Sequence, residues 1–454
     1  MPTRFLQDRF RDVTQHDAIV WQARTFSYRW LLDAIQQWEV RLDEHEIHAG
    51  SVTTLLADLS PQSVAALVAL TQRGAIIVPM TGSMRKNQPV YEAIAQCEIA
   101  IEISGDDETI SISHTQNDSP ATHELYAKLR AAAHPGLVLF SSGSTGTPKA
   151  AVHDFTRLLD KFRPSRPAMR TLAFLLFDHI GGLNTILHTL ATGGCIVVPS
   201  DRSPESVLAA IQNFAVQLLP TSPTFLKLLL ISGAWEDYDL QSLQMITYGT
   251  EPMSANILAA LNEKLPHVTF KQTYGLSEVG ILRSKSKDSS SLWMQLGGDG
   301  VQTRVVDNIL QIKSHSTMLG YLNAASPFSE DGWFITGDVV QVDGEYFKVL
   351  GRGGEIINVG GEKVYPAEVE AVIETMPQVH TAAVYGEANA IMGMIVCARV
   401  RLIPGVELSA KEVTQAVRQH CRNHLSPKQV PIRVTIDSQL SHDERFKKQR
   451  TPRP

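Results

Sequence analysis

Short apolar runs rich in β-branched residues alternate with amphipathic helical patterns along this 454-residue chain. Strand-like runs cover 51–57, 75–79 and 194–199, and turn-forming residues bound each of them. The segments 61–73 and 203–214 carry apolar residues at the three- and four-residue spacings of helices that pack one face against a sheet. The alternation therefore predicts an α/β fold built of layers.

The pattern restarts toward the C-terminus. A helix is predicted to begin near Pro366, because proline is tolerated in a first helical turn, and strand-like runs follow at 381–385 and 395–402. A chain of this length exceeds one ordinary hydrophobic core. We therefore expect a large layered N-terminal lobe over residues 1–350 and a small α+β C-terminal lobe over residues 351–454.

A loop rich in glycine and hydroxyl groups directly follows the apolar run 137–140. It consists of Ser141, Ser142, Gly143, Ser144, Thr145, Gly146, Thr147, Pro148 and Lys149. Glycines allow the backbone to approach an anion, hydroxyl and N–H groups donate hydrogen bonds, and lysine adds a positive charge. The alternative is a flexible linker, but an apolar segment resumes at 150–152. The loop predicts phosphate binding, with ATP as the first ligand to consider. Its glycine spacing differs from that of the ordinary P-loop.

Charge and cysteine usage exclude several classes of protein. Lys and Arg number 41 and Asp and Glu number 47, so the net charge of −6 provides no basic field for nucleic acid or an anionic membrane. The four cysteines lack metal-ligand spacing and mostly lie in apolar runs, which indicates reduced core thiols and no structural zinc. Residues 1–8 carry charges where a signal peptide is apolar, and no run approaches the roughly 20 apolar residues of a membrane span. We expect a cytoplasmic protein.

Three more motifs follow the loop in order. They are 274–278 (Tyr-Gly-Leu-Ser-Glu), 332–338 (Gly-Trp-Phe-Ile-Thr-Gly-Asp), and 351–352 (Gly-Arg) together with 360–370. With the loop, they resemble the adenylate-forming superfamily, which contains acyl- and aryl-CoA ligases, adenylation domains of nonribosomal peptide synthetases, and firefly luciferase. The likeness covers nearly the whole chain and is nearest to the CoA ligases.

This resemblance implies attack of a carboxylate on the α-phosphate of ATP, with release of pyrophosphate and formation of an acyl adenylate. The protein would mainly neutralise charge and align the reactants. Glu278 would hold Mg²⁺ and Ser277 would contact the α-phosphate. The phosphate-binding set would be Ser141, Ser142, Gly143, Ser144, Thr145, Gly146, Thr147 and Lys149.

The nucleoside would be held by the later motifs. Tyr274 and Gly275 would border the adenine, and Asp338 with Arg352 would bind the ribose. The segment after the strand-like run 245–247 resembles the other wall of the adenine and acyl pocket; it contains Tyr248, Gly249, Thr250 and Glu251.

The segment 177–184 resembles the wall of the acyl pocket in the CoA ligases. Phe177, Asp178, His179, Gly182 and Tyr248 are the candidate lining residues. Asp178 leaves amino acids open as substrates, because amino-acid-activating domains use an aspartate in such a Phe-Asp pair. The continuation after His179 looks more like the CoA ligases, so a carboxylic acid with an uncharged tail is preferred.

The family also implies a catalytic lysine near the C-terminus and a rotating small lobe. Lys447 matches the lysine position, Lys448 competes with it, and a solvated basic tail is the alternative. Gly354 stands at the pivot, where aspartate or lysine is usual, and would permit a wider range of φ and ψ. Gly360 and Gly361 are compatible with a narrow channel for pantetheine.

The leading hypothesis is an acyl- or aryl-CoA ligase that uses ATP, Mg²⁺ and CoA on a small carboxylic acid. A stand-alone adenylating enzyme that loads a carrier-protein phosphopantetheine or an amine shares the first half-reaction. From a different class, a nucleotide-binding sensor that has lost catalysis fits Gly354 and the unusual surroundings of Lys447. The sequence leaves the acid, the acceptor and the oligomeric state open.

Overall fold

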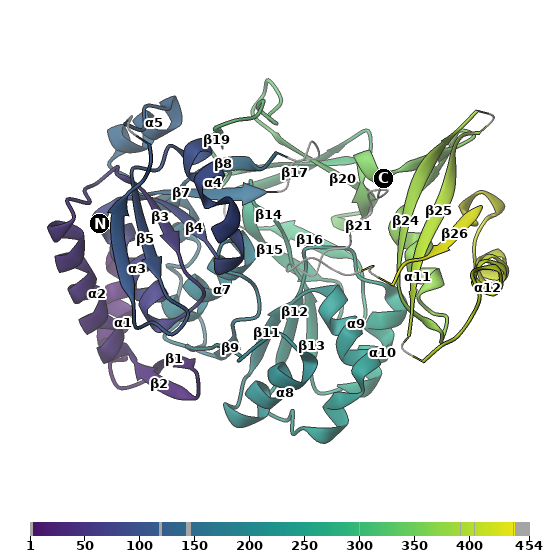
Figure 1. Cartoon of the computed structure of the whole chain (residues 1–454), viewed down its shortest axis with the longest axis horizontal. Coiled ribbons are helices and arrows are strands. Elements are labelled where there is room, and N and C mark those ends of the chain that lie inside the picture. The colour runs from purple at the N-terminus through teal and green to yellow at the C-terminus, as the bar shows by residue number, and fades with distance from the viewer. Residues whose placement is uncertain are drawn as a thin grey trace.

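A computed structural model describes residues 3–117, 120–141, 147–298, 300–390, 392–403, 405–438 and 440. Within these residues the chain forms a large layered lobe and a smaller lobe beside it, the latter drawn in light green to yellow (Figure 1). The predicted mixture of helices and sheets, with a large N-terminal and a small C-terminal part, is confirmed.

Two sheets of the large lobe have mainly parallel strands. Sheet A has the strand order β13 (Thr269–Gln272), β12 (Met245–Tyr248), β11 (Leu218–Thr221), β9 (Arg170–Leu172), β10 (Cys195–Val197), β1 (Asp17–Trp21) and β2 (Arg24–Ser27). Sheet B has the order β19 (Gly320–Tyr321), β8 (Lys149–Asp154), β7 (Gly136–Ser141), β4 (Ile76–Met80), β3 (Val52–Leu56), β5 (Ile99–Ile103) and β6 (Ile110–His114). Antiparallel pairing is confined to the margins of the described sheets, at β2, β6, β8 and β19.

Helices cover both faces of each of these sheets. One apolar core joins sheets A and B through α2 (Tyr28–Glu44), α3 (Pro61–Arg73), α6 (Phe155–Asp160) and α7 (Ile180–Ala191), with α1 (Arg4–Asp12) at its margin. The outer face of sheet A packs on α8 (Pro204–Asn213), α9 (Pro223–Ser232) and α10 (Ala255–Lys264). The outer face of sheet B packs on α4 (Gln88–Ala95) and α5 (Glu124–Ala132). The periodic apolar spacing of the sequence thus becomes alternating helix and sheet layers.

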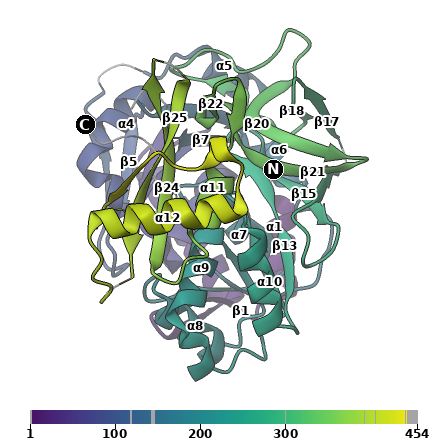
Figure 2. The same cartoon turned by 90° about the vertical axis from the view of Figure 1, so that its right-hand side faces the viewer.

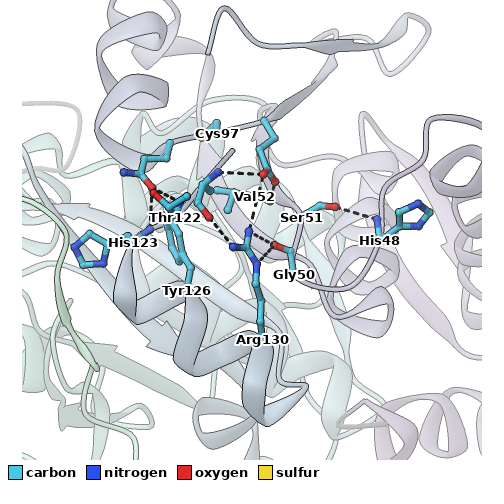
Figure 3. A network of polar contacts seen from close by, with 12 residues as sticks. His48, Gly50, Ser51, Val52, Cys97, Thr122, His123, Tyr126 and Arg130 are labelled. Carbon is cyan, nitrogen blue, oxygen red and sulfur yellow. Dashed lines mark hydrogen bonds and ion pairs between the residues drawn. The ribbon is translucent and has the colours of Figure 1, made fainter. Parts of the chain in front are cut away.

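A polar network fastens α5 to sheet B (Figure 3). The Arg130 guanidinium donates to the carbonyl oxygen of Gly50 at 2.8 and 3.0 Å, just before β3, and to the carbonyl oxygen of Ala121 at 2.5 Å. The Tyr126 hydroxyl donates to the carbonyl oxygen of Ala95 at 2.7 Å. These bonds satisfy buried carbonyls before β3, before α5 and at the end of α4, which would otherwise cost free energy.

The third sheet, sheet C, is antiparallel. Its order is β14 (Tyr274–Leu276), β15 (Gly280–Ser286), β16 (Met294–Gly297), β21 (Tyr346–Arg352), β20 (Phe334–Asp343), β18 (Ile309–Ser314) and β17 (Val301–Val306). The segment 284–291 looks like a loop in the sequence, but β15 continues through Ser286, because Ser284 to Ser286 pair with β16. Pairing satisfies these backbone groups in spite of the polar side chains.

The small lobe has a core of its own, drawn from residues 357–434. Strands β23 (Glu362–Val364), β22 (Ile357–Val359), β25 (Gly393–Leu402), β24 (Val379–Asn389) and β26 (Arg433–Ile436) form its sheet. Helices α11 (Pro366–Ile373) and α12 (Ala410–His424) pack with it, and α12 lies across the sheet in Figure 2. The helix predicted near Pro366 is confirmed, with proline in its first turn.

Two further expectations concern cysteines and membrane helices. Cys97, Cys195, Cys397 and Cys421 are buried and free, as predicted. Within the part of the chain that the structure describes, no helix is long and apolar enough to cross a bilayer.

Candidate functional site

Two of the sequence motifs meet where sheets B and C adjoin. The turn between β14 and β15 carries Ser277 and Glu278, and it faces Tyr321 of β19. The Tyr321 hydroxyl donates to Glu278 Oε1 at 2.7 Å. Lys149, at the start of β8, places Nζ 5.6 Å from the centroid of the Tyr321 ring. One tyrosine therefore connects the end of the phosphate loop to the candidate metal ligand through a cation–π contact and a hydrogen bond.

A buried histidine forms a hydrogen bond to the same turn. His153 of β8 is fully buried, and its Nε2 lies 2.5 Å from the carbonyl oxygen of Ser277. Burial lowers the pKa of His153 to about 4, so the ring is neutral near pH 7. Because the carbonyl can only accept, Nε2 carries the hydrogen. The bond fixes the backbone at Ser277 relative to sheet B.

Asn323 anchors the far end of the phosphate loop. Its Nδ2 donates to the carbonyl oxygen of Pro148 at 2.8 Å, and its Oδ1 accepts from the backbone N–H of Ala150 at 3.0 Å. The side chain thus binds the backbone on both sides of Lys149. This arrangement fixes the backbone of Lys149 at the start of β8.

Asp338 and Arg352 lie opposite each other on the paired strands β20 and β21. Arg352 Nε lies 2.8 Å from Asp338 Oδ1, while the Tyr274 hydroxyl donates to Asp338 Oδ2 at 2.5 Å. The Asp338 side chain is 8% exposed, and the Arg352 side chain is 50% exposed. The structure therefore brings together three residues that the sequence assigned separately to adenine and ribose.

Burial sets the ionisation of this group. It raises the pKa of Asp338, and the Arg352 charge and the Tyr274 hydrogen bond oppose the rise. Burial, followed by the Asp338 charge, raises the pKa of Tyr274 well above its usual value, so the phenol keeps its proton. Each carboxylate oxygen has a further lone pair beyond these partners. Asp338 can therefore still accept hydrogen bonds from a ligand's hydroxyl groups.

The donor set suits a cation that is bound mainly by a ligand's phosphates. Glu278 is the candidate ligand, and its Oε1 is already oriented by Tyr321. Among the described residues, no group of three or more His, Cys, Asp or Glu side chains could hold a metal ion. Mg²⁺ is commonly bound by one or two carboxylates together with substrate phosphates and water, so a single glutamate fits this ion.

The residues at the end of β12 and directly after it make specific contacts within the fold. A Cβ atom at Gly249 would lie 2.6 Å from Thr273 Oγ1, so glycine permits close approach of the neighbouring strand. Thr250 has a φ of 72°, which is uncommon for a residue with a side chain. Glu251 Oε1 accepts from the backbone N–H of Thr224 at 2.7 Å, in the first turn of α9. Tyr248 is buried in the core beneath sheet A.

The candidate acid-binding residues lie at the start of α7. His179 is the N-cap residue, and Phe177 and Asp178 are buried before it. A Cβ at Gly182 would lie 2.0 Å from the Leu176 carbonyl oxygen, so backbone and not a substrate group fills the space beside this candidate lining residue. A Cβ at Gly181 would meet only the Leu175 side chain, at 3.0 Å.

A large cleft lies at the carboxyl ends of β1, β3, β4, β9 and β10. Its volume is about 1370 Å³, and it reaches from Trp21 and Asp58 to His380 and Arg401 of the small lobe. Phe177 lines it, but Tyr274, Glu278 and Asp338 do not. The cleft is therefore distinct from the polar cluster that the motifs form.

Some of the remaining candidate site residues lie within the residues that the structure describes, and others lie outside them. A Cβ at Gly354 would meet no atom within 4 Å, and its φ is not positive, so a side chain fits there in this conformation. Gly360 and Gly361 have φ values of 55° and 83° in the turn between β22 and β23. Ser141 ends β7 and Thr147 precedes β8. Ser142, Gly143, Ser144, Thr145, Gly146, Lys447 and Lys448 lie outside the described residues.

Sequence reasoning missed Tyr321, His153 and Asn323. Each lies within an ordinary strand pattern or directly after one, and no glycine or charge pattern distinguishes it. The pairing of β19 with β8 brings Tyr321 and Asn323 to the loop, although about 170 positions separate them in sequence. A strand at the edge of a sheet gives no such signal in a single sequence.

Comparisons with known proteins show the family of the chain. Residues 6–322 match the family described as AMP-binding enzyme, and residues 368–447 match the AMP-binding enzyme C-terminal domain. The chain is 29% identical to an indoleacetate–CoA ligase of Aromatoleum aromaticum over 324 residues, which is 65% of this chain and 63% of that protein. It is 27% identical to a 2-succinylbenzoate–CoA ligase of Enterococcus faecalis over 353 residues, 71% and 68% of the two chains.

A solved structure shows the same fold. The anthranilate CoA ligase AuaEII in complex with anthranoyl-AMP aligns with a TM-score of 0.83 at 18% identity, covering 99% of this chain and 95% of that one. In sequence, the chain spans about two thirds of the length of the curated relatives it matches. The family match covers well over half of the chain and includes the hydrogen-bonded cluster around Glu278. The chain belongs to the AMP-binding enzyme family.

Proposed function

We propose that the protein activates a carboxylic acid with ATP, forms an acyl adenylate with release of pyrophosphate, and transfers the acyl group to the thiol of CoA. The observation that carries this proposal is the convergence of Lys149, Glu278 and Tyr321 at one edge of sheet B. A positive charge and a carboxylate side by side suit a magnesium-bound triphosphate. The names of the curated relatives, which are CoA ligases, support the same chemistry.

In the first step, a carboxylate oxygen attacks the α-phosphorus and the bond to the β-phosphate oxygen breaks. Both reactants are anions, so the protein must reduce their repulsion and align them. Lys149 and the loop that precedes it would bind the departing pyrophosphate. Ser277, held by His153 through its carbonyl, would direct its hydroxyl to the α-phosphate.

Asp338 would hold the nucleoside. Its two oxygens are fixed by Tyr274 and Arg352 and can accept further hydrogen bonds from ribose hydroxyls. Mg²⁺, held by Glu278 and the phosphates, would supply charge neutralisation. Gly275 is closely packed, because a Cβ there would lie 2.4 Å from Ile281 Cδ1, so its part in the adenine pocket would be played by its backbone.

The second step would use the small lobe. We propose that the segment from residue 351 rotates about Gly354, brings the turn at Gly360 and Gly361 to the thiol channel, and withdraws Lys447 from the α-phosphate. The thiolate would then attack the acyl carbon, and AMP would leave with the bridging oxygen. A carrier-protein phosphopantetheine or an amine in place of CoA is the alternative acceptor, and the sensor hypothesis requires that neither step occurs.

Acid-dependent exchange of labelled pyrophosphate into ATP tests the first step. The panel comprises aryl, short-chain, medium-chain and amino acids, each with the unaltered protein and with Lys447→Ala. Exchange that depends on one class of acid and falls sharply in the variant is the expected result. Thioester formation on addition of CoA identifies the acceptor. Bound ATP with no exchange for any acid would favour the sensor.

A further inference from the structure

A group of basic side chains lies around α7 and the β14–β15 hairpin. They come from the end of α6, the loop after it, α7, β13 and β15; the five are Lys161, Arg166, His188, Lys271 and Arg283. We call them the cationic cluster. Helix α7 contacts both strands of the hairpin, and β13 contacts β15.

These charges are close enough to act on one another. Burial, then Arg283, lowers the pKa of Arg166. Burial, then Arg166 and Arg283, lowers the pKa of Lys271. Burial, with Arg166, Lys161 and Lys271 adding to its effect, lowers the pKa of His188 to about 4. The five side chains therefore lie within electrostatic reach of one another; Arg283 is exposed, the other four are partly buried, and His188 is neutral near pH 7.

Lys161 connects α7 to the hairpin through neutral acceptors. Its Nζ donates to Asn184 Oδ1 at 2.6 Å and to the carbonyl oxygen of Ile281 at 2.9 Å. The same Nζ lies 4.9 Å from the centroid of the Phe162 ring. An ammonium that is removed from water usually has a carboxylate partner, because neutral acceptors compensate its desolvation only in part.

The cluster lacks a balancing carboxylate within the described part of the chain. Among those residues, no ion pair joins any of its five members to Asp or Glu. Asp160, the residue before Lys161, pairs with Arg163 at 2.8 Å and with His315 at 3.5 Å. Several like charges brought together without a counter-charge destabilise a fold, and an anion bound among them would relieve their repulsion.

The cluster adjoins the proposed acid site. On α7, Asn184 and His188 follow the candidate residue His179, and they stand one turn apart on the same face. On the hairpin, Gly275 pairs with Ile281, whose carbonyl binds Lys161. From the rise of a helix, Asn184 and His188 lie about 8 and 14 Å along the axis from His179. An elongated acid activated beside His179 would therefore present its far end to the cluster.

We propose that the cationic cluster binds a second carboxylate at the far end of the acid substrate, which makes the preferred substrate a dicarboxylic acid. This inference rests on the proposed function, because it uses the position of the reacting carboxylate. It replaces the uncharged tail expected from the sequence. The large cleft is lined by none of the five residues, which argues against the phosphates of an acceptor in that cleft as the bound anion.

Matched acids test the proposal. The probes are adipate, suberate and terephthalate, each compared with its half-amide, which keeps the shape but removes one charge. Pyrophosphate exchange gives kcat/KM, and calorimetry gives the affinity of each acid without any reaction. For at least one pair, the dicarboxylate should exceed its half-amide by about tenfold or more in both measurements.

Variants assign the effect to the cluster. Lys271→Gln combined with Arg283→Gln should reduce the dicarboxylate preference to about twofold or less and leave the half-amide unchanged. Lys161→Met should do the same, and its thermal unfolding reports whether it folds. Lys285→Gln, an exposed lysine on β15, is the matched control and should keep the full preference.

The two proposals fail in different ways. Exchange that proceeds equally with both members of every pair would overturn the dicarboxylate proposal and leave adenylation standing. Selective binding that the double variant abolishes, without exchange, would support the anion site and contradict adenylation. The absence of both selective binding and exchange, for every pair, would overturn the dicarboxylate proposal.

Discussion

The Asp338 site and the cationic cluster use charge in opposite ways. Asp338 is buried, and its two oxygens contact Arg352 and Tyr274 within the chain. The cluster brings several positive side chains together, and Lys161 at its centre donates to neutral acceptors. A charge that is paired within the chain, such as Asp338, is organised before its ligand binds, and we call such a group matched. A group of charges of one sign without such partners favours a ligand of the opposite sign.

Removing Asp338 should have the largest effect, because it destroys the matched site. We expect Asp338→Ala to lower kcat/KM for ATP by roughly a hundredfold to a thousandfold, since Arg352 and the Tyr274 hydroxyl lose their common partner. Pyrophosphate exchange at several ATP concentrations measures it. Asp343→Asn, exposed on the same strand, should behave like the unaltered protein. Equal activity of both variants would contradict a nucleoside role for Asp338.

A buried ion pair to which no ligand role is assigned shows how much burial alone contributes to stability. Lys227 of α9 and Glu374, just after α11, form a 3.1 Å ion pair between the lobes, with side chains 11% and 6% exposed. Both line a crevice of about 190 Å³ between the lobes. Lys227→Met should lower the free energy of unfolding by about 3 kcal/mol, because Glu374 stays buried. Urea unfolding measures it.

The control for that variant is an exposed ion pair. Lys264→Met removes the partner of Glu236, at a site where both side chains are more than half exposed, and should cost at most about 0.5 kcal/mol. A similar loss for both variants would contradict the importance of burial. A Lys227→Met protein that keeps its stability would show that the interlobe pair is readily replaced.

Tyr321→Phe removes the hydroxyl that donates to Glu278. The ring under Lys149 remains, but Glu278 loses its 2.7 Å hydrogen bond. We expect about a tenfold decrease in kcat/KM for magnesium-bound ATP, and a higher magnesium concentration should recover part of it. Magnesium titrations of the exchange rate provide the measurement. A loss that magnesium cannot recover would point to general misfolding of the turn.

The smallest effect should be a pH dependence of dicarboxylate binding. Burial, with Arg166 adding to it, lowers the pKa of Lys161 to about 7, so its charge is present below that pH and lost above it. A second carboxylate is ionised across this whole range. Affinity should therefore decrease a few-fold from about pH 6 to pH 8.5, as Lys161 loses its charge.

Calorimetry with adipate at several pH values measures this dependence. His188 is neutral throughout the range, because its pKa is about 4, and does not contribute. Lys161→Met should remove the pH dependence. Affinity that increases with pH in the unaltered protein would contradict the role of Lys161.

Local patterns in the sequence predicted much of the fold. Helix α3 begins at Pro61 and ends at Arg73, the predicted bounds, because its apolar spacing is continuous and Ser60 caps it. The segment 284–291, which looks like a loop in the sequence, instead contains the last three residues of β15, because pairing with β16 overrides the polar composition. Propensity within a short segment cannot report a distant strand partner.

The candidate site was predicted where a motif is contiguous and missed where it is assembled by the fold. Asp338 and Arg352 were both identified, although their contact depends on the register of β20 and β21. The cationic cluster draws on Lys161 and Arg283, about 120 positions apart, and each resembles an ordinary surface charge in sequence. Gly182 was a candidate lining residue of the acyl pocket, yet its missing side chain accommodates the Leu176 backbone.

The most direct test of adenylation follows the oxygen atoms of the acid. A substrate acid labelled with oxygen-18 in its reacting carboxylate is incubated with ATP, magnesium and CoA, and the nucleotide product is analysed by mass spectrometry. Attack on the α-phosphorus followed by thiol transfer predicts AMP that carries one oxygen-18 atom. Unlabelled AMP, or label found in inorganic phosphate beside ADP, would contradict the acyl adenylate.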